Sequence, residues 1–303
     1  MTDRSPPHGG PDSARRLVRT LAEPHHLLVL ASDIAPDEVE SLVASRSDSA
    51  GSVGESDLRL LPGVHLTGPW SVGSDLRSVF DLPGWAAQAY LLRCPVQRGH
   101  PLPAELAGVD PVLDAFLDGV PIGVEQESID HLRAVGRRLG GALRLAGSGA
   151  VVVLDPESAT DLTVHAPVWL EPDACLQVLR ATLPEPRNPL DDLPEGVEEL
   201  ETYGIASAIG EDLVDVTVTG TAHPPLVLRD EPWARRGVVA YEVRWRPAHP
   251  ETAFAYRPPL AQREARARAG ELIERTAAAI YDAVDGAVCD DDGFLVDPAD
   301  LRR

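Results

Sequence analysis

Apolar residues along the first half of the chain form short continuous runs and one long amphipathic stretch. Residues 27–31 predict a buried strand, and residues 87–94 and 150–155 predict further strands. Apolar side chains at spacings of three and four predict a helix over residues 124–139, which a pair of glycines ends. Because a helix with one apolar stripe must pack against another element, the pattern predicts helices that cover a sheet.

The second half repeats this alternation after a segment that is rich in proline and acidic residues. That segment, residues 184–198, has little apolar content and predicts a linker. Residues 238–245 alternate between apolar and polar side chains, as expected of a strand with one buried face. The longest helix is predicted over residues 261–284, and a small hairpin is predicted around the turn at residues 290–293.

A weak self-similarity connects the two halves. In each, a strand leads to a long helix, then to a Gly-Ala pair, a turn that contains glycine, and an Asp-Pro pair, at Asp155 and Asp297 respectively. Hairpins that follow helices favour α+β over alternating βαβ order. We therefore predict an α+β protein of two related sheet-plus-helix units arranged as an internal duplication. A ferredoxin-like (split βαβ) order is the topology that we consider for each unit. The alternative is a chance coincidence of common turn signals.

These patterns divide the chain into four parts. We expect a disordered tail at residues 1–13, a first α+β unit at 14–183, the acidic linker at 184–198, and a second α+β unit at 199–303. Within the first unit, residues 45–57 are expected to form a flexible loop and residues 101–119 to contain a helix.

The charge balance restricts the partners. The 303 residues include 48 acids and 27 arginines, without any lysine, and carry a net charge of −21. Such an excess repels phosphate backbones and anionic membranes, so we expect neither nucleic-acid nor membrane binding. Solubility explains the charge, and the alternative is an acidic patch that recruits a basic partner. The lack of lysine excludes a Schiff-base mechanism.

The cysteines and the apolar runs indicate the compartment. The three cysteines lie far apart and show no zinc-ligand spacing, which disfavours a zinc site or a disulfide framework. The N-terminus has no apolar segment typical of a signal peptide, and every apolar run is too short to cross a bilayer. We expect a cytoplasmic protein without a cofactor.

Two glycine-containing motifs resemble ligand loops but lack their defining residues. In the acidic run that ends at Gly293, the first and last ligand positions of a calcium loop would be Val288 and Ala299, so we predict a polar turn and no metal site. Residues 147–149 lack the GK[ST] ending of a phosphate loop and lie before a strand, which predicts a hairpin turn.

The candidates for a site are His165, Trp169 and Glu171, which lie near a strand-to-helix junction. His165 with Glu171 could act as a general acid–base pair, and Trp169 could contact a ligand. The alternative is that His165 ends a strand, Trp169 packs and Glu171 favours a helix N-terminus. His25 and His26 are expected to be solvated. The arginines of the long helix are also expected to form a solvated face, and the alternative is a basic strip that binds an anionic ligand or an acidic partner.

The stretch 140–169 and the ending 286–301 resemble conserved hypothetical proteins of high-GC actinobacteria, a resemblance that implies no activity and no catalytic residue. The lack of a catalytic signature favours a non-catalytic protein that binds a protein partner or a small ligand, as an oligomer or in a complex. The alternative is an enzyme of another class that uses His165 and Glu171.

Overall fold

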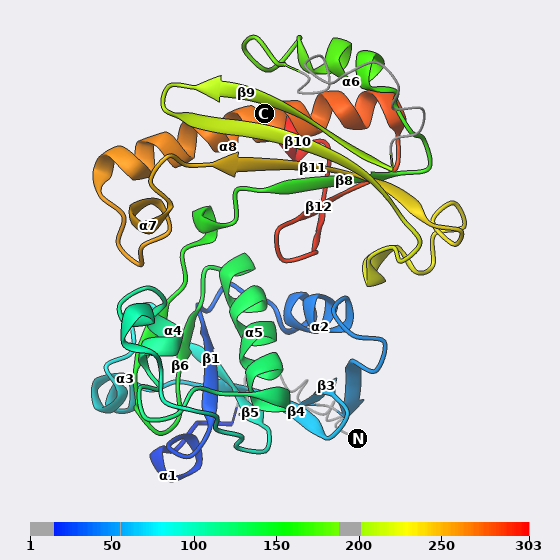
Figure 1. Ribbon diagram of the computed structural model, residues 1–303. Helices are drawn as coiled ribbons and strands as arrows, with labels where there is room; N and C mark the ends of the chain where they lie inside the picture. The colour runs from blue at the N-terminus through cyan, green and yellow to red at the C-terminus, as the bar shows by residue number, and fades with distance from the viewer. Residues whose placement is uncertain (1–14, 55, 188–200, 303) are drawn as a thin grey trace, which may run out of the picture.

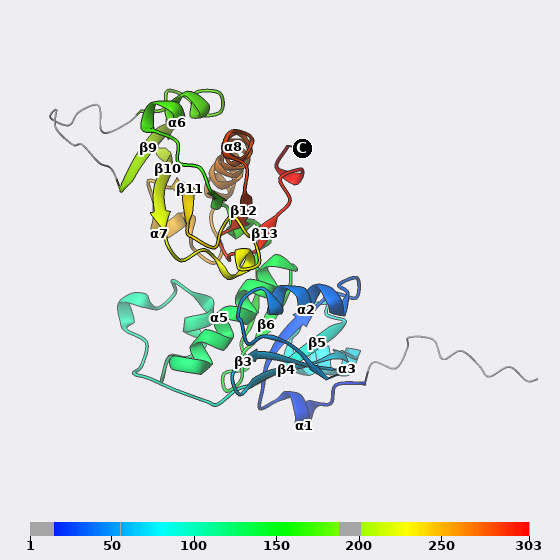
Figure 2. The ribbon, with the colours of Figure 1, turned by 90° about the vertical axis from the view of Figure 1, so that its right-hand side faces the viewer.

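The computed structural model describes residues 15–54, 56–187 and 201–302, and shows two antiparallel sheets with helices packed on them. The two sheet-plus-helix units are stacked one above the other (Figures 1 and 2). This arrangement confirms the predicted α+β class. The expected tail at 1–13 and most of the expected linker lie outside the described residues.

The first sheet contains seven strands in the order β2-β3-β4-β5-β1-β6-β7. Their bounds are β1 His26–Leu30, β2 Gly51–Gly54, β3 Asp57–Leu61, β4 Val64–Ser71, β5 Gln88–Arg93, β6 Ala142–Arg144 and β7 Val151–Val153. Strand β1 is buried at every position because helices cover both faces of this sheet.

The helices of the first unit lie on both faces of the sheet, and each face buries its own set of alternating strand residues. On one face, α2 (Pro36–Ala44) and α5 (Gly123–Arg138) pack against residues such as Leu28 and Leu30. On the other face, α3 (Ser74–Phe80) and the region of α1 (Arg19–Ala22) pack against Leu27 and Val29. The side chains of a strand alternate between its two faces, which explains this division.

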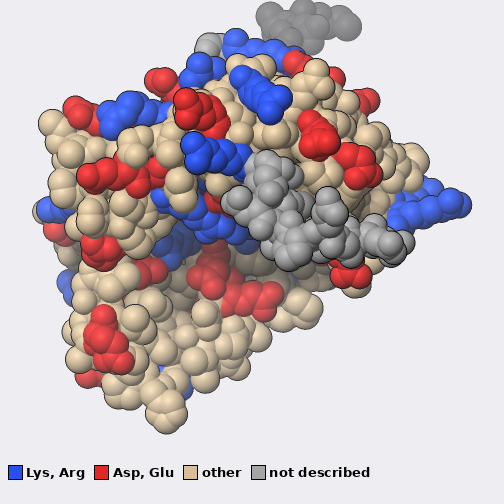
Figure 3. All heavy atoms as spheres, turned by 45° about the horizontal axis from the view of Figure 1, so that its top comes forward, with Lys and Arg blue, Asp and Glu red and all other residues tan. Residues whose placement is uncertain are grey.

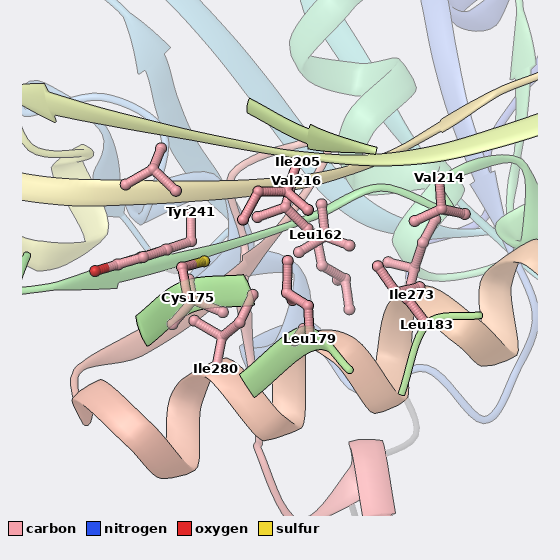
Figure 4. Packing of buried hydrophobic residues seen from close by; sticks show 14 of the residues in the cluster. Leu162, Cys175, Leu179, Leu183, Ile205, Val214, Val216, Tyr241, Ile273 and Ile280 are labelled. Atoms are coloured by element: carbon pink, nitrogen blue, oxygen red, sulfur yellow. The ribbon is translucent and has the colours of Figure 1, made fainter. Parts of the chain in front are cut away.

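The second sheet contains six strands in the order β13-β12-β8-β11-β10-β9. Their bounds are β8 Leu162–Ala166, β9 Thr202–Ile209, β10 Asp212–Thr221, β11 Val238–Arg246, β12 Ala287–Asp290 and β13 Leu295–Val296. One face is covered by α6 (Pro172–Leu179) and α8 (Leu260–Val284), with α7 (Pro250–Ala253) beside α8. Figure 4 shows Leu162, Cys175 and Ile280 meeting between these helices and the strands.

The two units share one order of elements. When β2 and the helices shorter than eight residues are set aside, each runs strand, helix, three strands, helix and hairpin. The strand orders β7-β6-β1-β5-β4-β3 and β13-β12-β8-β11-β10-β9 then correspond one to one. In both units the long helix joins two parallel strands that flank a third.

The pairing registers extend this correspondence to single residues. Val29 of β1 lies between Ala89 and Ala142, as His165 of β8 lies between Ala240 and Ala287. The glycine before the last hairpin of each unit packs against the backbone oxygen of the equivalent strand residue. An added Cβ at Gly141 would meet the oxygen of Val29, and an added Cβ at Gly286 would meet the oxygen of His165.

Three segments differ from the sequence-based expectation. The chain passes from the first sheet to the second between β7 and β8. Residues 162–183, which were expected in the first unit, therefore form part of the second sheet and its helix α6. The expected loop at 45–57 contains β2. The expected helix at 101–119 is only η1 (Ala104–Leu106) and α4 (Pro111–Asp114), because Gly108 takes a φ of 83° between them. Further 3₁₀ turns are η2 (Pro156–Ser158), η4 (Leu226–Leu228) and η5 (Asp300–Arg302).

Candidate functional site

A cleft of about 540 Å³ lies where the two units meet, a size typical of ligand sites. Its walls come from the C-terminal end of α5, the connector 154–161 between the sheets, one stripe of α8 and the β12–β13 hairpin. Both units are therefore needed to form it. Apolar lining is supplied by Pro156, Ala159, Leu162, Ala267, Val296 and Leu301.

The β12–β13 hairpin fixes one wall of the cleft by inserting into the first unit. Phe294 is only 1% exposed and belongs to the hydrophobic core that lies between α2, α5 and the first sheet. The Arg46 guanidinium lies 5.4 Å from the centre of the Phe294 ring and donates to the carbonyl oxygen of Asp292. Figure 1 shows the hairpin reaching from the upper unit toward α5 and α2.

Each arginine in the cleft wall is held by an aspartate. Arg137 makes a two-point contact with Asp292, at 2.8 Å from Nε and 2.7 Å from Nη2. Arg138 pairs with Asp290 at 3.2 Å. These two pairs join α5 of the first unit to the hairpin of the second.

The third pair joins α8 to the connector. Arg266 lies 2.6 Å from Asp155, and its side chain is only 7% exposed. The expectation that the arginines of this helix are solvated is therefore wrong for Arg266, because the connector packs over it. An arginine so deeply buried requires the carboxylate, since an unpaired buried charge is costly.

Three glutamates of the cleft have no ion-pair partner among the described residues: Glu157, Glu271 and Glu274. Arg275, one turn after Glu271, donates to the backbone oxygen of Glu271 and leaves its carboxylate free. Partial burial and the neighbouring Glu271 raise the pKa of Glu274. Since aspartates already neutralise the arginines, these glutamates give the cleft a net negative charge.

In the predicted polar turn at residues 290–293, the carboxylates bind other groups of the protein. Asp290 Oδ1 accepts hydrogen bonds from the backbone N–H groups of Asp292 and Phe294, at 3.0 and 2.9 Å. Burial raises the pKa of Asp290. No group of three or more potential metal ligands occurs among the described residues.

His165 and Glu171, the candidate acid–base pair, are not brought together. Leu162, Val164 and Ala166 point toward α6 and α8, so His165 lies on the opposite face of the sheet, beneath the segment between β10 and β11. Its buried Nδ1 has no hydrogen-bond partner among the described residues, and burial lowers its pKa to about 4. Glu171 is exposed at the N-terminus of α6, and neither residue lines the cleft.

Trp169 is held in place through its backbone neighbours. The Tyr241 hydroxyl accepts from the Leu170 N–H and donates to the Val168 oxygen, both at 2.8 Å. The Tyr203 hydroxyl donates to the Leu170 oxygen at 2.5 Å, and its ring meets Trp169 edge to face at 5.4 Å. Trp169 therefore belongs to a packed junction before α6.

Sequence reasoning missed a buried polar network in the first unit. His26, expected to be solvated, is 4% exposed; its Nδ1 accepts from the Ala146 N–H and its Nε2 lies 3.0 Å from Glu125. Arg98 and the Gln97 N–H also bind Glu125, at 2.8 and 2.7 Å. Burial lowers the pKa of His26. Only the fold could reveal this site, because His26 and Glu125 are 99 positions apart.

Comparisons with protein-family models, with curated proteins and with solved structures found no match. Within the described parts of the chain, no helix combines the length and apolar character needed to cross a membrane.

Proposed function

We propose that the protein acts by binding rather than by catalysis, and that the cleft between its two units holds the ligand, a small molecule or a segment of a protein partner. The observation that carries the proposal is the make-up of the cleft, in which both units contribute walls, arginines are already paired and glutamates are left free. A site built this way offers fixed recognition groups around an open volume.

The placement of the candidate acid–base residues also supports binding. A general base must reach the proton that it removes, and His165 is buried on a face away from Glu171 and outside the cleft lining. Under the rival hypothesis, an enzyme would use these two residues. Replacing His165 by Ala should leave ligand binding unchanged if the proposal holds.

Gly270 provides the direct test. It lies in the middle of α8 at the cleft, and an added Cβ there would meet no atom within 4 Å. Gly270→Leu should fill the cleft without disturbing the fold. In a thermal-shift screen of defined acidic, neutral and basic peptides and metabolites, a ligand should stabilise the native protein and lose this effect with Gly270→Leu. Ligands that stabilise both proteins equally would overturn the proposal.

We further propose that the two units arose by internal duplication. Support comes from the shared strand order, from the equivalent positions of Val29 and His165, and from the Asp-Pro pairs, in which Asp155 and Asp297 each accept a hydrogen bond from the backbone N–H two residues on. The ferredoxin-like order stays a prediction, because β3 and β7 in the first unit, and β9 and β13 in the second, are additional to its four strands.

We also propose a cytoplasmic location. All three cysteines are free, and burial is the main cause that raises the pKa of Cys94 to about 11 and that of Cys289 to about 12. Free, unreactive thiols suit a reducing compartment.

A further inference from the structure

The charges of the cleft define the chemistry of its ligand. We infer that the cleft binds an organic dication, a molecule that carries two amino or guanidinium groups on apolar stems, such as a basic peptide segment or a polyamine. This inference rests on the proposed function and specifies the ligand class of the same site.

The pairing of the charges is asymmetric. Arg137, Arg138 and Arg266 each contact an aspartate at 2.6 to 3.2 Å, so an anionic ligand would have to displace a carboxylate from its partner. For Arg266, whose side chain is 7% exposed, that exchange would leave Asp155 without its cation. An anion is therefore disfavoured.

The free carboxylates favour a cation instead. Glu271 and Glu274 lie three positions apart on α8, where like charges repel each other, and this repulsion contributes to the raised pKa of Glu274. Glu157 adds a third carboxylate from the connector. A bound cation would relieve this repulsion, whereas a neutral ligand would bury the carboxylates further without a partner.

The shape of the cleft suits long side chains. Its α8 wall runs from Arg266 to Glu274, which is about 12 Å at the helical rise of 1.5 Å per residue. The small residues Ala267 and Gly270 lie between them and leave room beside the helix. Apolar side chains from the connector and the last hairpin, including Pro156 and Val296, can pack against the methylene stems of a basic ligand.

The net charge alone does not explain a specific site. On the face seen in Figure 3, positive and negative side chains lie interspersed and do not form a single acidic surface. The test must therefore separate binding in the cleft from general attraction to a protein of charge −21.

The experiment measures fluorescence anisotropy with a labelled Arg-Ala-Arg-Ala peptide, and with Glu-Ala-Glu-Ala and Gln-Ala-Gln-Ala as matched probes. Unlabelled spermidine serves as a competitor. The basic peptide should bind and the other two should not. Glu271→Gln with Glu274→Gln should weaken binding by about twofold to fivefold for each carboxylate removed. Glu211→Gln with Glu264→Gln removes two exposed charges outside the cleft and should leave the affinity unchanged.

The outcomes separate the two proposals. If spermidine competes fully with the peptide, the charged groups alone suffice; if it does not, the polypeptide is the ligand. Equal loss in both glutamine pairs would overturn the inference, because binding would then follow net charge. A neutral or acidic ligand that Gly270→Leu excludes would also overturn it while leaving the proposed binding function intact. A basic peptide that still binds Gly270→Leu would overturn both.

Discussion

Tyr90 and Tyr241 occupy equivalent positions in the two units but differ in what their hydroxyls do. Tyr90 pairs with Leu28 of β1 and Tyr241 with Val164 of β8, and both rings are buried. The Tyr241 hydroxyl makes two backbone hydrogen bonds, whereas the Tyr90 hydroxyl is buried with no partner among the described residues. The same substitution should therefore have opposite effects in the two units.

The expected magnitudes follow from these contacts. Tyr241→Phe leaves the Leu170 N–H and the Val168 oxygen without their partner, and we expect a loss of about 1–2 kcal/mol because both groups can partly reach water. Tyr90→Phe removes an unsatisfied buried hydroxyl and should stabilise the protein by up to about 1 kcal/mol. The two variants remove the same atom, so each is the control for the other.

Urea unfolding followed by tryptophan fluorescence measures both changes. The midpoint should fall for Tyr241→Phe and stay or rise for Tyr90→Phe, with an unchanged dependence of the free energy on urea. A second transition would report that the units unfold separately, and each variant should then shift the transition of its own unit. A larger loss with Tyr90→Phe than with Tyr241→Phe would refute the reasoning.

Other predictions concern the buried histidines, the hairpin and the helix glycine. Burial is the main cause that lowers the pKa of His131 and of His165 to about 4 in the folded protein, so each contributes stability above pH 6.5 that is lost as the pH falls toward 4, by roughly 3 kcal/mol. His165→Val, which copies the equivalent residue of the first unit, should reduce this acid sensitivity in pH-dependent urea titrations; an unchanged slope would contradict the assignment. Phe294→Ala should cost about 3–5 kcal/mol and increase hydrogen exchange in α2 and α5, whereas Leu295→Ala, at a half-exposed position, should do neither. Gly270→Ala should raise the melting temperature through a gain of up to about 1 kcal/mol, and a lower melting temperature would mean that the cleft is closed at this point.

The sequence predicted those elements whose periodicity is strong and local. The two long helices, expected at 124–139 and 261–284, are observed at Gly123–Arg138 and Leu260–Val284, and the strand expected at 238–245 is Val238–Arg246. The sequence pattern assigned residues 162–183 to the wrong unit, because the pattern shows that a segment is a strand but does not show which strands it pairs with. Strand β8 is adjacent in sequence to the first sheet, yet it pairs with β11 and β12. The proline-rich and acidic composition of residues 184–198 predicted a linker, but it gave no information about which sheet β8 joins.

The candidate site was beyond sequence reasoning for a related reason. Arg137 and Asp292 are 155 positions apart, and Arg266 and Asp155 are 111 apart. Each of these residues has an ordinary local explanation as a helix or turn residue. Only the docking of one unit on the other makes the aspartates neutralise the arginines and leaves the glutamates of α8 as the free charges of the cleft.

One position at which the two units differ contributes to this docking. The last hairpins pair alike, with Leu145 N–H bound to the Ala150 oxygen in the first unit and Asp290 N–H to the Phe294 oxygen in the second. Ala150 therefore stands where the second unit has Phe294. An alanine could not fill the space between α2 and α5 that Phe294 occupies, so the first hairpin could not anchor a partner in this way. The hairpin wall of the cleft is thus fixed by a large apolar side chain that is buried in the other unit and by flanking aspartates that arginines of that unit bind.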